Sequence, residues 1–170
     1  MKIELKDRII LNNQFKILSA LYPLESSYYN NLVKILENGY ELHYNELSQN
    51  FSDSFTKEKS KFVLDILEMY SIIKLSIIND KSIEIDPEEV EFKGFDGNHE
   101  WEYINYALYF LYDLDRYREL HKESNYRYYN THSRTLNRYE KMLEKYKSYG
   151  DKYKLTETQI KELISIFDNG

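Results

Sequence analysis

The sequence Phe92-Lys93-Gly94-Phe95-Asp96-Gly97-Asn98-His99-Glu100-Trp101, continued by Tyr103 to Tyr112, decides the fold expected for this chain. Apolar residues recur at positions 101, 104, 108 and 111, which is the spacing of a helix. Gly94 allows a bend with a positive φ, and Asp96 is placed to cap the helix. Since Tyr and Phe occupy the remaining sides, the segment predicts a helix buried in a bundle or at a subunit interface.

The residues before this stretch also predict helices. One covers residues 8–22 and stops at Pro23, a second follows Ser26 or Ser27 and ends at Gly39, a short one covers 45–51, and a long one begins near Thr56. The segment 72–85 is β-branched, so it predicts either a longer helix or a hairpin. A short helical piece is expected over 87–90, where proline fits the first turn.

Beyond the central helix, residues 120–133 are polar and Tyr-rich without a clear period, which predicts a loop. Another helix runs from Leu136 until Gly150. The last helix has a capping box, Thr156 with Gln159, and Leu155 is placed to pack on Ile160. The chain is therefore expected to be one all-α, multihelical domain over residues 1–170, with about seven helices and room for a short extended or hairpin segment near 74–95.

Composition limits the function classes. The 170 residues include no cysteine, which excludes disulfides, thiolate zinc sites and a cysteine nucleophile. The sequence has no secretory signal and no long apolar run, so a soluble cytoplasmic protein without membrane contact is expected. No metal or cofactor motif is complete, and an enzyme is not favoured.

Charge is unevenly distributed along the sequence. The net charge is −6, which argues against a surface that binds nucleic acid throughout. Residues 122–154 nevertheless hold nine Lys or Arg and four Asp or Glu. This region predicts a basic face that could bind nucleic acid, with Tyr126, Tyr128 or Tyr129 stacking on bases; its cations are Arg127, Arg134, Arg138, Lys141 and Lys145.

A helix-turn-helix over residues 44–70, followed by a wing at 74–85, is a second route to DNA. Its second helix would begin with Lys57, Lys59 and Lys61. Glu58 and Asp65 on that helix, and the absence of Arg or Gln near its start, argue against base reading.

The order of several short motifs resembles the YfbU family of uncharacterised bacterial proteins. The similarity runs from about residue 7 to the end, and its motifs are Ile9-Ile10-Leu11-Asn12-Asn13-Gln14-Phe15-Lys16, Gly39-Tyr40, Glu46-Leu47, Ile66-Leu67-Glu68-Met69-Tyr70, Phe92-Lys93-Gly94-Phe95-Asp96, Arg116-Tyr117 and Tyr139-Glu140-Lys141-Met142-Leu143. The resemblance implies a helical cytoplasmic domain that tends to form oligomers and whose biochemical function is uncharacterised.

Two constellations are candidate sites. Asn12, Gln14, Lys16, Asp96 and Arg116 could line a polar pocket, although the amides could instead bond helix ends. Asp96 could be a simple helix cap, and Arg116 could belong to a structural ion pair.

The second constellation is Arg116 with His121, an Arg-x4-His spacing that resembles the motif of helical HEPN ribonucleases. There the arginine would stabilise a phosphate and the histidine would move a proton. The favoured expectation is a non-catalytic regulatory or interaction module that forms a homo-oligomer and binds an unknown protein partner.

Overall fold

A computed structural model of the chain describes residues 2–87, 89–122, 129–151 and 153–169. These residues fold into helices and loops, which confirms the predicted all-α class. The chain divides into two compact units, residues 1–54 and 55–170, which are described separately. The α-helices are α1 (Leu5–Leu21), α2 (Ser26–Asn38), α3 (Lys57–Asn79), α4 (Trp101–Leu108), α5 (Leu136–Lys147) and α6 (Glu157–Asn169).

The first unit is a helix pair with a small core. α1 and α2 lie side by side, joined by the 3₁₀ turn Pro23–Glu25. Gly39 adopts φ 64° and ends α2 as predicted, because a left-handed residue there lets the Tyr40 N–H reach the Ile35 carbonyl at 3.0 Å. Arg8 donates from Nε to the Leu36 carbonyl at 2.9 Å, so a cation sits on the carbonyl end of α2.

The segment after α2 differs from the expected short helix at 45–51. The structure has a 3₁₀ helix over Glu41–Ser48 instead, anchored by the buried Tyr44, and residues 51–56 have no regular structure. The first helix of the expected helix-turn-helix is therefore absent. The longer-helix alternative for 72–85 is right, since α3 continues to Asn79, and the hairpin or wing is wrong.

α3 is the core helix of the second unit. Thr56 caps it by accepting the Lys59 N–H at 3.3 Å. Its buried residues continue into the β-branched segment, with Ile73 and Ile77 at most 7% exposed, because they pack in the same core as the preceding turns. Because these residues are buried together in the core, the segment forms a helix despite the β propensity of its branched residues.

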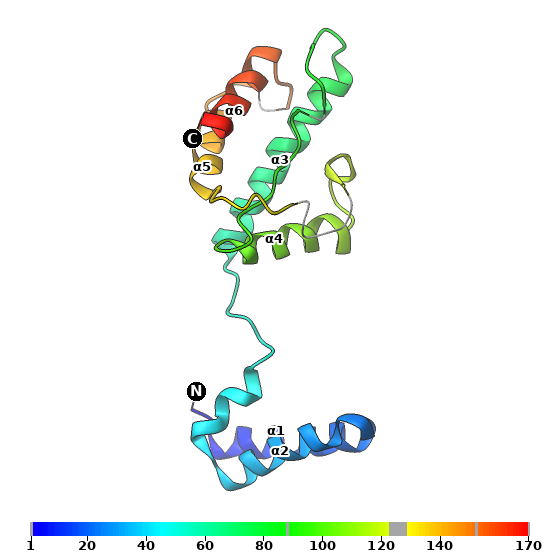
Figure 1. The fold of residues 1–170 in the computed structure, drawn as a ribbon, viewed down its shortest axis with the longest axis vertical. Helices are drawn as coiled ribbons and strands as arrows, with labels where there is room; N and C mark the ends of the chain where they lie inside the picture. Colours follow the sequence, from blue (N-terminus) through cyan, green and yellow to red (C-terminus); the bar gives the residue numbers. More distant parts are fainter. Residues whose placement is uncertain (1, 88, 123–128, 152, 170) are drawn as a thin grey trace. The chain divides into compact units, whose positions relative to one another are not determined.

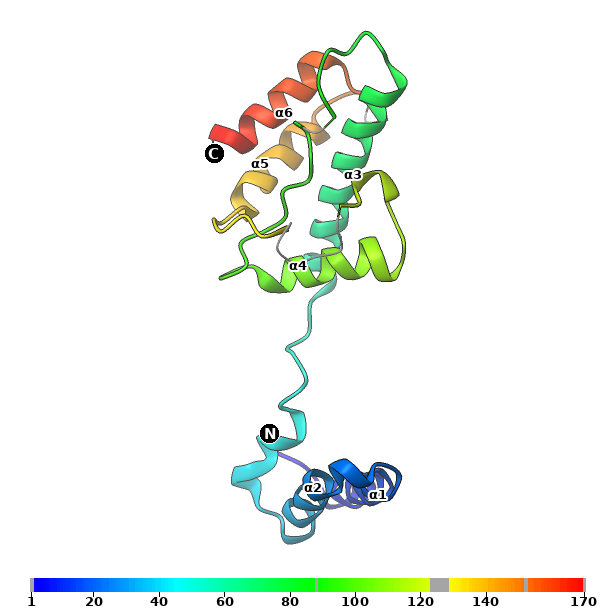
Figure 2. The ribbon, with the colours of Figure 1, turned by 45° about the vertical axis from the view of Figure 1, so that its right-hand side comes forward.

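α5 and α6 lie side by side along α3, while α4 crosses near the start of α3, as Figure 1 and Figure 2 both show. The rings of Tyr70, Phe92, Phe95 and Tyr139 meet between these elements with centroids 5.4 to 6.1 Å apart. The predicted capping box of α6 is present: the Thr156 N–H donates to the Gln159 side chain at 2.9 Å, and Thr156 Oγ1 accepts the Gln159 N–H.

Two local expectations around α4 are wrong, and the expected burial within a bundle holds for one face of the helix. The helix has one buried face, formed by Ile104 and Ala107 and continued by Leu111 in the π-helical turn Tyr109–Asp113, whereas Trp101 is 46% exposed. Asp96 precedes a separate turn at 97–99, so Glu100, not Asp96, is the residue before the helix. The described residues of 87–90 form a turn rather than a helical piece.

Candidate functional site

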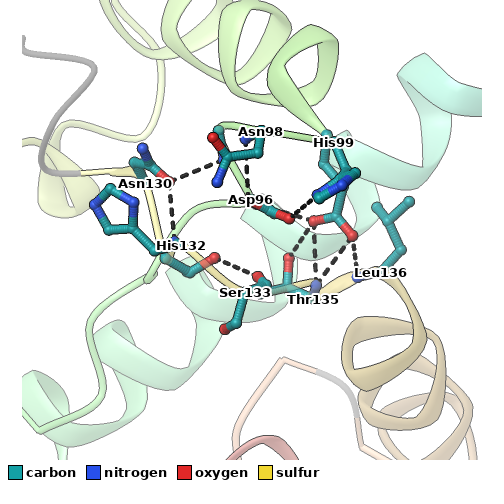
Figure 3. Close-up of polar contacts among 11 residues, drawn as sticks. Asp96, Asn98, His99, Asn130, His132, Ser133, Thr135 and Leu136 are labelled. Atoms are coloured by element: carbon teal, nitrogen blue, oxygen red, sulfur yellow. Dashed lines mark hydrogen bonds and ion pairs between the residues drawn. The ribbon is translucent and has the colours of Figure 1, made fainter.

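The loop that precedes α4 in sequence meets the loop that precedes α5. We call residues 94–100 and 130–136 the loop junction (Figure 3). Phe95 donates its N–H to the Tyr129 carbonyl at 2.9 Å and accepts the Thr131 N–H at 3.0 Å. Gly94 has φ 88°, as predicted, and a Cβ there would lie 1.9 Å from the Tyr129 carbonyl oxygen. Only glycine fits a backbone approach this close.

Asn130 holds the junction from one side. Its Oδ1 accepts the Gly97 N–H and the His132 N–H, each at 2.9 Å. One amide oxygen therefore ties together two loops that are 33 residues apart in sequence.

Asp96 is 2% exposed and begins the turn at 97–99 rather than the helix. Its Oδ1 accepts the Asn98 N–H at 3.0 Å, and its Oδ2 accepts from His99 Nδ1 at 2.6 Å (Figure 3). The hydrogen bond from Asn98, followed by that from His99, lowers the pKa of Asp96 below its usual value. The carboxylate is thus ionised and holds the turn that leads into α4.

Glu100 is 3% exposed and is the most heavily bonded side chain of the junction. Its carboxylate accepts the Thr135 N–H at 3.1 Å, the Thr135 hydroxyl at 3.0 Å, the Leu136 N–H at 3.3 Å and the Asp96 N–H at 3.0 Å. The anion therefore lies on the N-terminal end of α5, where unpaired N–H groups and the helix dipole favour negative charge.

The chemistry open to the junction is limited by these bonds. His99 is oriented by Asp96 and its side chain is 57% exposed, an arrangement that can hold a general base. Within the described residues, however, no hydroxyl group is hydrogen-bonded to His99, and no group of three acidic or histidine side chains could hold a metal ion. The hydrogen bonds of Glu100 form a clamp between the residue before α4 and the first residues of α5.

The predicted polar pocket divides between the two units. In the first unit, Lys16 Nζ lies 2.7 Å from Glu37 Oε1, and hydrogen bonds from Lys16 and Asn12 lower the pKa of Glu37. Gln14 is exposed and does not join them. Asn12 Oδ1 is buried, and no described residue donates to it.

In the second unit, the two remaining residues of the predicted pocket, Asp96 and Arg116, make different contacts. Asp96 belongs to the loop junction, whereas Arg116 follows the π-helical turn with an exposed side chain, its N–H donating to the Leu111 carbonyl at 3.1 Å. Asp115 pairs with Arg118 instead of Arg116.

His121 contacts the backbone of Arg116, not its guanidinium. Its Nε2 donates to the Arg116 carbonyl at 2.9 Å, and its ring centroid lies 4.7 Å from that of Tyr112. One of the two ring nitrogens of His121, the proton-transfer residue of the ribonuclease hypothesis, is therefore engaged by a backbone carbonyl.

The predicted basic face is partly occupied by intramolecular contacts. Arg138 donates to the Phe167 carbonyl at 3.3 Å and lies over its ring, and Lys145 pairs with Glu162 at 3.0 Å. Tyr129 is fully buried, so it cannot stack on bases as predicted. Lys141 and Arg134 are exposed; the predicted residues Tyr126, Arg127 and Tyr128 lie outside the described part of the chain.

Sequence reasoning missed Glu100 and Thr135. Glu100 stands beside Trp101 in a run of polar residues, and nothing in its spacing distinguishes it from an exposed residue. Its role depends on Thr135, 35 residues away, and only the tertiary structure brings the two together.

The family model described as the YfbU domain matches residues 1–166, which covers the first unit and the second unit as far as residue 166. The chain belongs to the YfbU family. It is also 38% identical over 115 residues to the UPF0304 protein MJECS11 of Methanocaldococcus jannaschii, an alignment that covers 65% of this chain and 67% of that protein. Among the described residues, each helix is too short or too polar to span a bilayer.

Proposed function

We propose that this YfbU chain is a non-catalytic interaction module that works as a homo-oligomer assembled through the outer face of α1. The observation that carries the proposal is that α1, a helix of 17 residues, has no buried side chain. Several of its aliphatic residues are instead exposed: Ile9 is 54%, Ile17 59% and Leu21 66% accessible.

The exposed apolar side chains of α1 are more than the single, scattered apolar residues of an ordinary surface. Ile10 is 47% exposed beside Ile9, and Leu24 after the helix is fully exposed. Ile10, Ile17 and Leu21 lie at helical spacing on one side of α1, and an exposed apolar face of this kind marks an interaction site. Covering each Ile or Leu side chain would stabilise the assembly by about 1.5–3 kcal/mol relative to full exposure.

The size of the first unit supports the same proposal. Its buried cluster consists of Leu32, Ile35 and Tyr44, with a few partly buried neighbours. Units of this length bury a smaller share of their surface than larger domains, and association is one way to add core. A second copy of the chain supplies the same apolar face.

The proposal is tested by light scattering on the chain at micromolar concentration. Ile17→Glu places a charge on the face and is expected to reduce the measured mass toward that of a monomer. Ser27→Glu adds the same charge at an exposed position of α2 and is the matched control. A wild-type chain that is monomeric throughout, or an Ile17→Glu variant with the wild-type mass, would contradict the proposal.

A further inference from the structure

A cavity of about 380 Å³ lies in the second unit, beside the loop junction, the start of α5 and the end of α6. Three cationic side chains, Lys93, Lys122 and Arg138, line it, and none of its described lining residues is acidic. The chain as a whole carries a net charge of −6, so the sign of the charge is reversed locally. We call this the basic cavity. Its volume is in the range of small-molecule sites.

Lys122 is a fixed cation of the basic cavity, with a side chain only 17% exposed. Its Nζ lies 2.8 Å from Glu91 Oε2 and 5.7 Å from the ring centroid of Tyr129. An ammonium group has three N–H donors, and a single carboxylate leaves donors for a ligand. The position of this cation is therefore set before any ligand binds.

Arg138 is held by two neutral groups. Its Nη1 donates to the Phe167 carbonyl at 3.3 Å, and its guanidinium lies 5.6 Å from the centroid of the Phe167 ring. Within the described part of the chain, no carboxylate forms an ion pair with Arg138. Its charge is thus not neutralised, and the remaining N–H groups of the planar guanidinium suit two oxygens of one anion.

Lys93 supplies the third cation from the loop junction. Its side chain is exposed and has no ion pair with any described residue. The backbone beside it is fixed, because Gly94 packs against the Tyr129 carbonyl in a conformation with φ 88°. The ammonium group is therefore available to a ligand without the loss of an existing contact.

Asn130 and Ser133 add neutral donors to the lining of the basic cavity. Asn130 Oδ1 accepts the N–H groups of Gly97 and His132, which fixes the orientation of the amide (Figure 3). Among the described residues, no group accepts from Asn130 Nδ2 or pairs with the Ser133 hydroxyl. Both groups can donate to the oxygens of an anion.

The charge of the basic cavity selects among anions. Its three cations and the one acid that pairs with them, Glu91, leave an excess of two positive charges. A phosphate monoester carries about −1.5 to −2 charges at pH 7, whereas a carboxylate or a phosphodiester carries a single charge. We infer that the basic cavity binds a small molecule through a terminal phosphate monoester. The site lies wholly in the second unit and does not depend on association through α1.

Binding is tested by isothermal titration calorimetry of the full chain at fixed ionic strength, with ribose 5-phosphate as the probe. Binding is expected, and inorganic phosphate is expected to compete with it. Lys93→Gln should raise the dissociation constant about tenfold, because it removes a charge-assisted hydrogen bond. Lys141→Gln makes the same change of charge at an exposed position of α5 outside the cavity, and it should leave the dissociation constant unchanged.

Three results would overturn the inference. The first is no heat of binding at millimolar ribose 5-phosphate, or equal binding of ribose, which lacks the phosphate. The second is equal weakening by Lys93→Gln and Lys141→Gln, which would assign the binding to general attraction by surface charge. The third is equal competition by a single-stranded oligonucleotide without a terminal phosphate, which would show that phosphodiesters suffice.

Discussion

Glu100 accepts both the hydroxyl and the backbone N–H of Thr135, at 3.0 and 3.1 Å, in a site where neither residue is more than 3% exposed. This relationship joins the residue before α4 to the residue before α5. One buried carboxylate therefore connects the start of α4 to the start of α5. The stability of the second unit should therefore depend on this pair.

Glu100→Ala is expected to lower the free energy of unfolding by about 3 kcal/mol, since it leaves the buried N–H groups of Thr135 and Asp96 and the partly buried N–H of Leu136 without their acceptor. Urea unfolding followed by Trp101 fluorescence measures it, because the single Trp lies in the second unit. The exposed Glu144→Ala is the control, expected to change stability by less than about 0.5 kcal/mol. Equal stability of the two variants would mean that water replaces the carboxylate.

Asp96 should make the second unit sensitive to acid. Its pKa is lowered in the folded chain by the hydrogen bonds from Asn98 and His99, so its contribution to stability is present above the ordinary aspartate pKa of about 3.9. The contribution is lost as pH falls through the lowered folded pKa.

The comparison of wild type with Asp96→Asn isolates this effect from the other carboxylates. The wild-type chain is expected to be more stable at neutral pH, and the difference in unfolding free energy should shrink as pH falls below about 4. Unfolding curves at a series of pH values measure it. A difference that stays constant down to the acid limit would refute the ionised state of Asp96.

Gly94→Ala is expected to destabilise the second unit by more than about 2 kcal/mol, because the new Cβ would meet the Tyr129 carbonyl at 1.9 Å on a backbone with φ 88°. Gly150→Ala is the matched control, since a Cβ there meets no atom within 4 Å. Thermal unfolding of the two variants compares them directly. Similar melting temperatures would show that the junction can open by the width of a methyl group.

Ser76→Ala tests a buried contact between α3 and the segment before α6. Ser76 Oγ accepts the Leu155 N–H at 3.0 Å, and both residues are at most 5% exposed. Loss of the hydroxyl leaves that N–H unpaired, with an expected cost of about 2 kcal/mol in the free energy of unfolding. Exposed Ser133→Ala should change stability by less than about 0.5 kcal/mol, and denaturant unfolding distinguishes the two.

Local signals predicted several ends of helices correctly. Gly39 ends α2 in a left-handed conformation, and Thr156 with Gln159 begins α6 as a capping box. These features depend on residues within one turn of each other. Such contacts form wherever the sequence places them, and a reading of neighbouring residues can find them.

Segments whose state depends on distant packing were harder to predict. The β-branched residues after Ile72 could form a hairpin or a helix, and burial of Ile73 and Ile77 in the core decides for helix. The apolar pattern of α4 predicted burial on several sides, yet within this chain Trp101 stays partly exposed. Periodicity identifies a face without saying what covers it.

The amino-acid sequence by itself determined the all-α class, the family and the helix ends at Gly39 and Thr156, because these follow from periodicity, motif order and contacts between near neighbours. Only the tertiary structure decided that Glu100, rather than Asp96, directly precedes α4 and accepts hydrogen bonds from Thr135 before α5. It also decided that α2 uses one face of α1 and leaves the other exposed. Both outcomes depend on which distant backbone groups a side chain meets after folding, and sequence spacing does not contain that information.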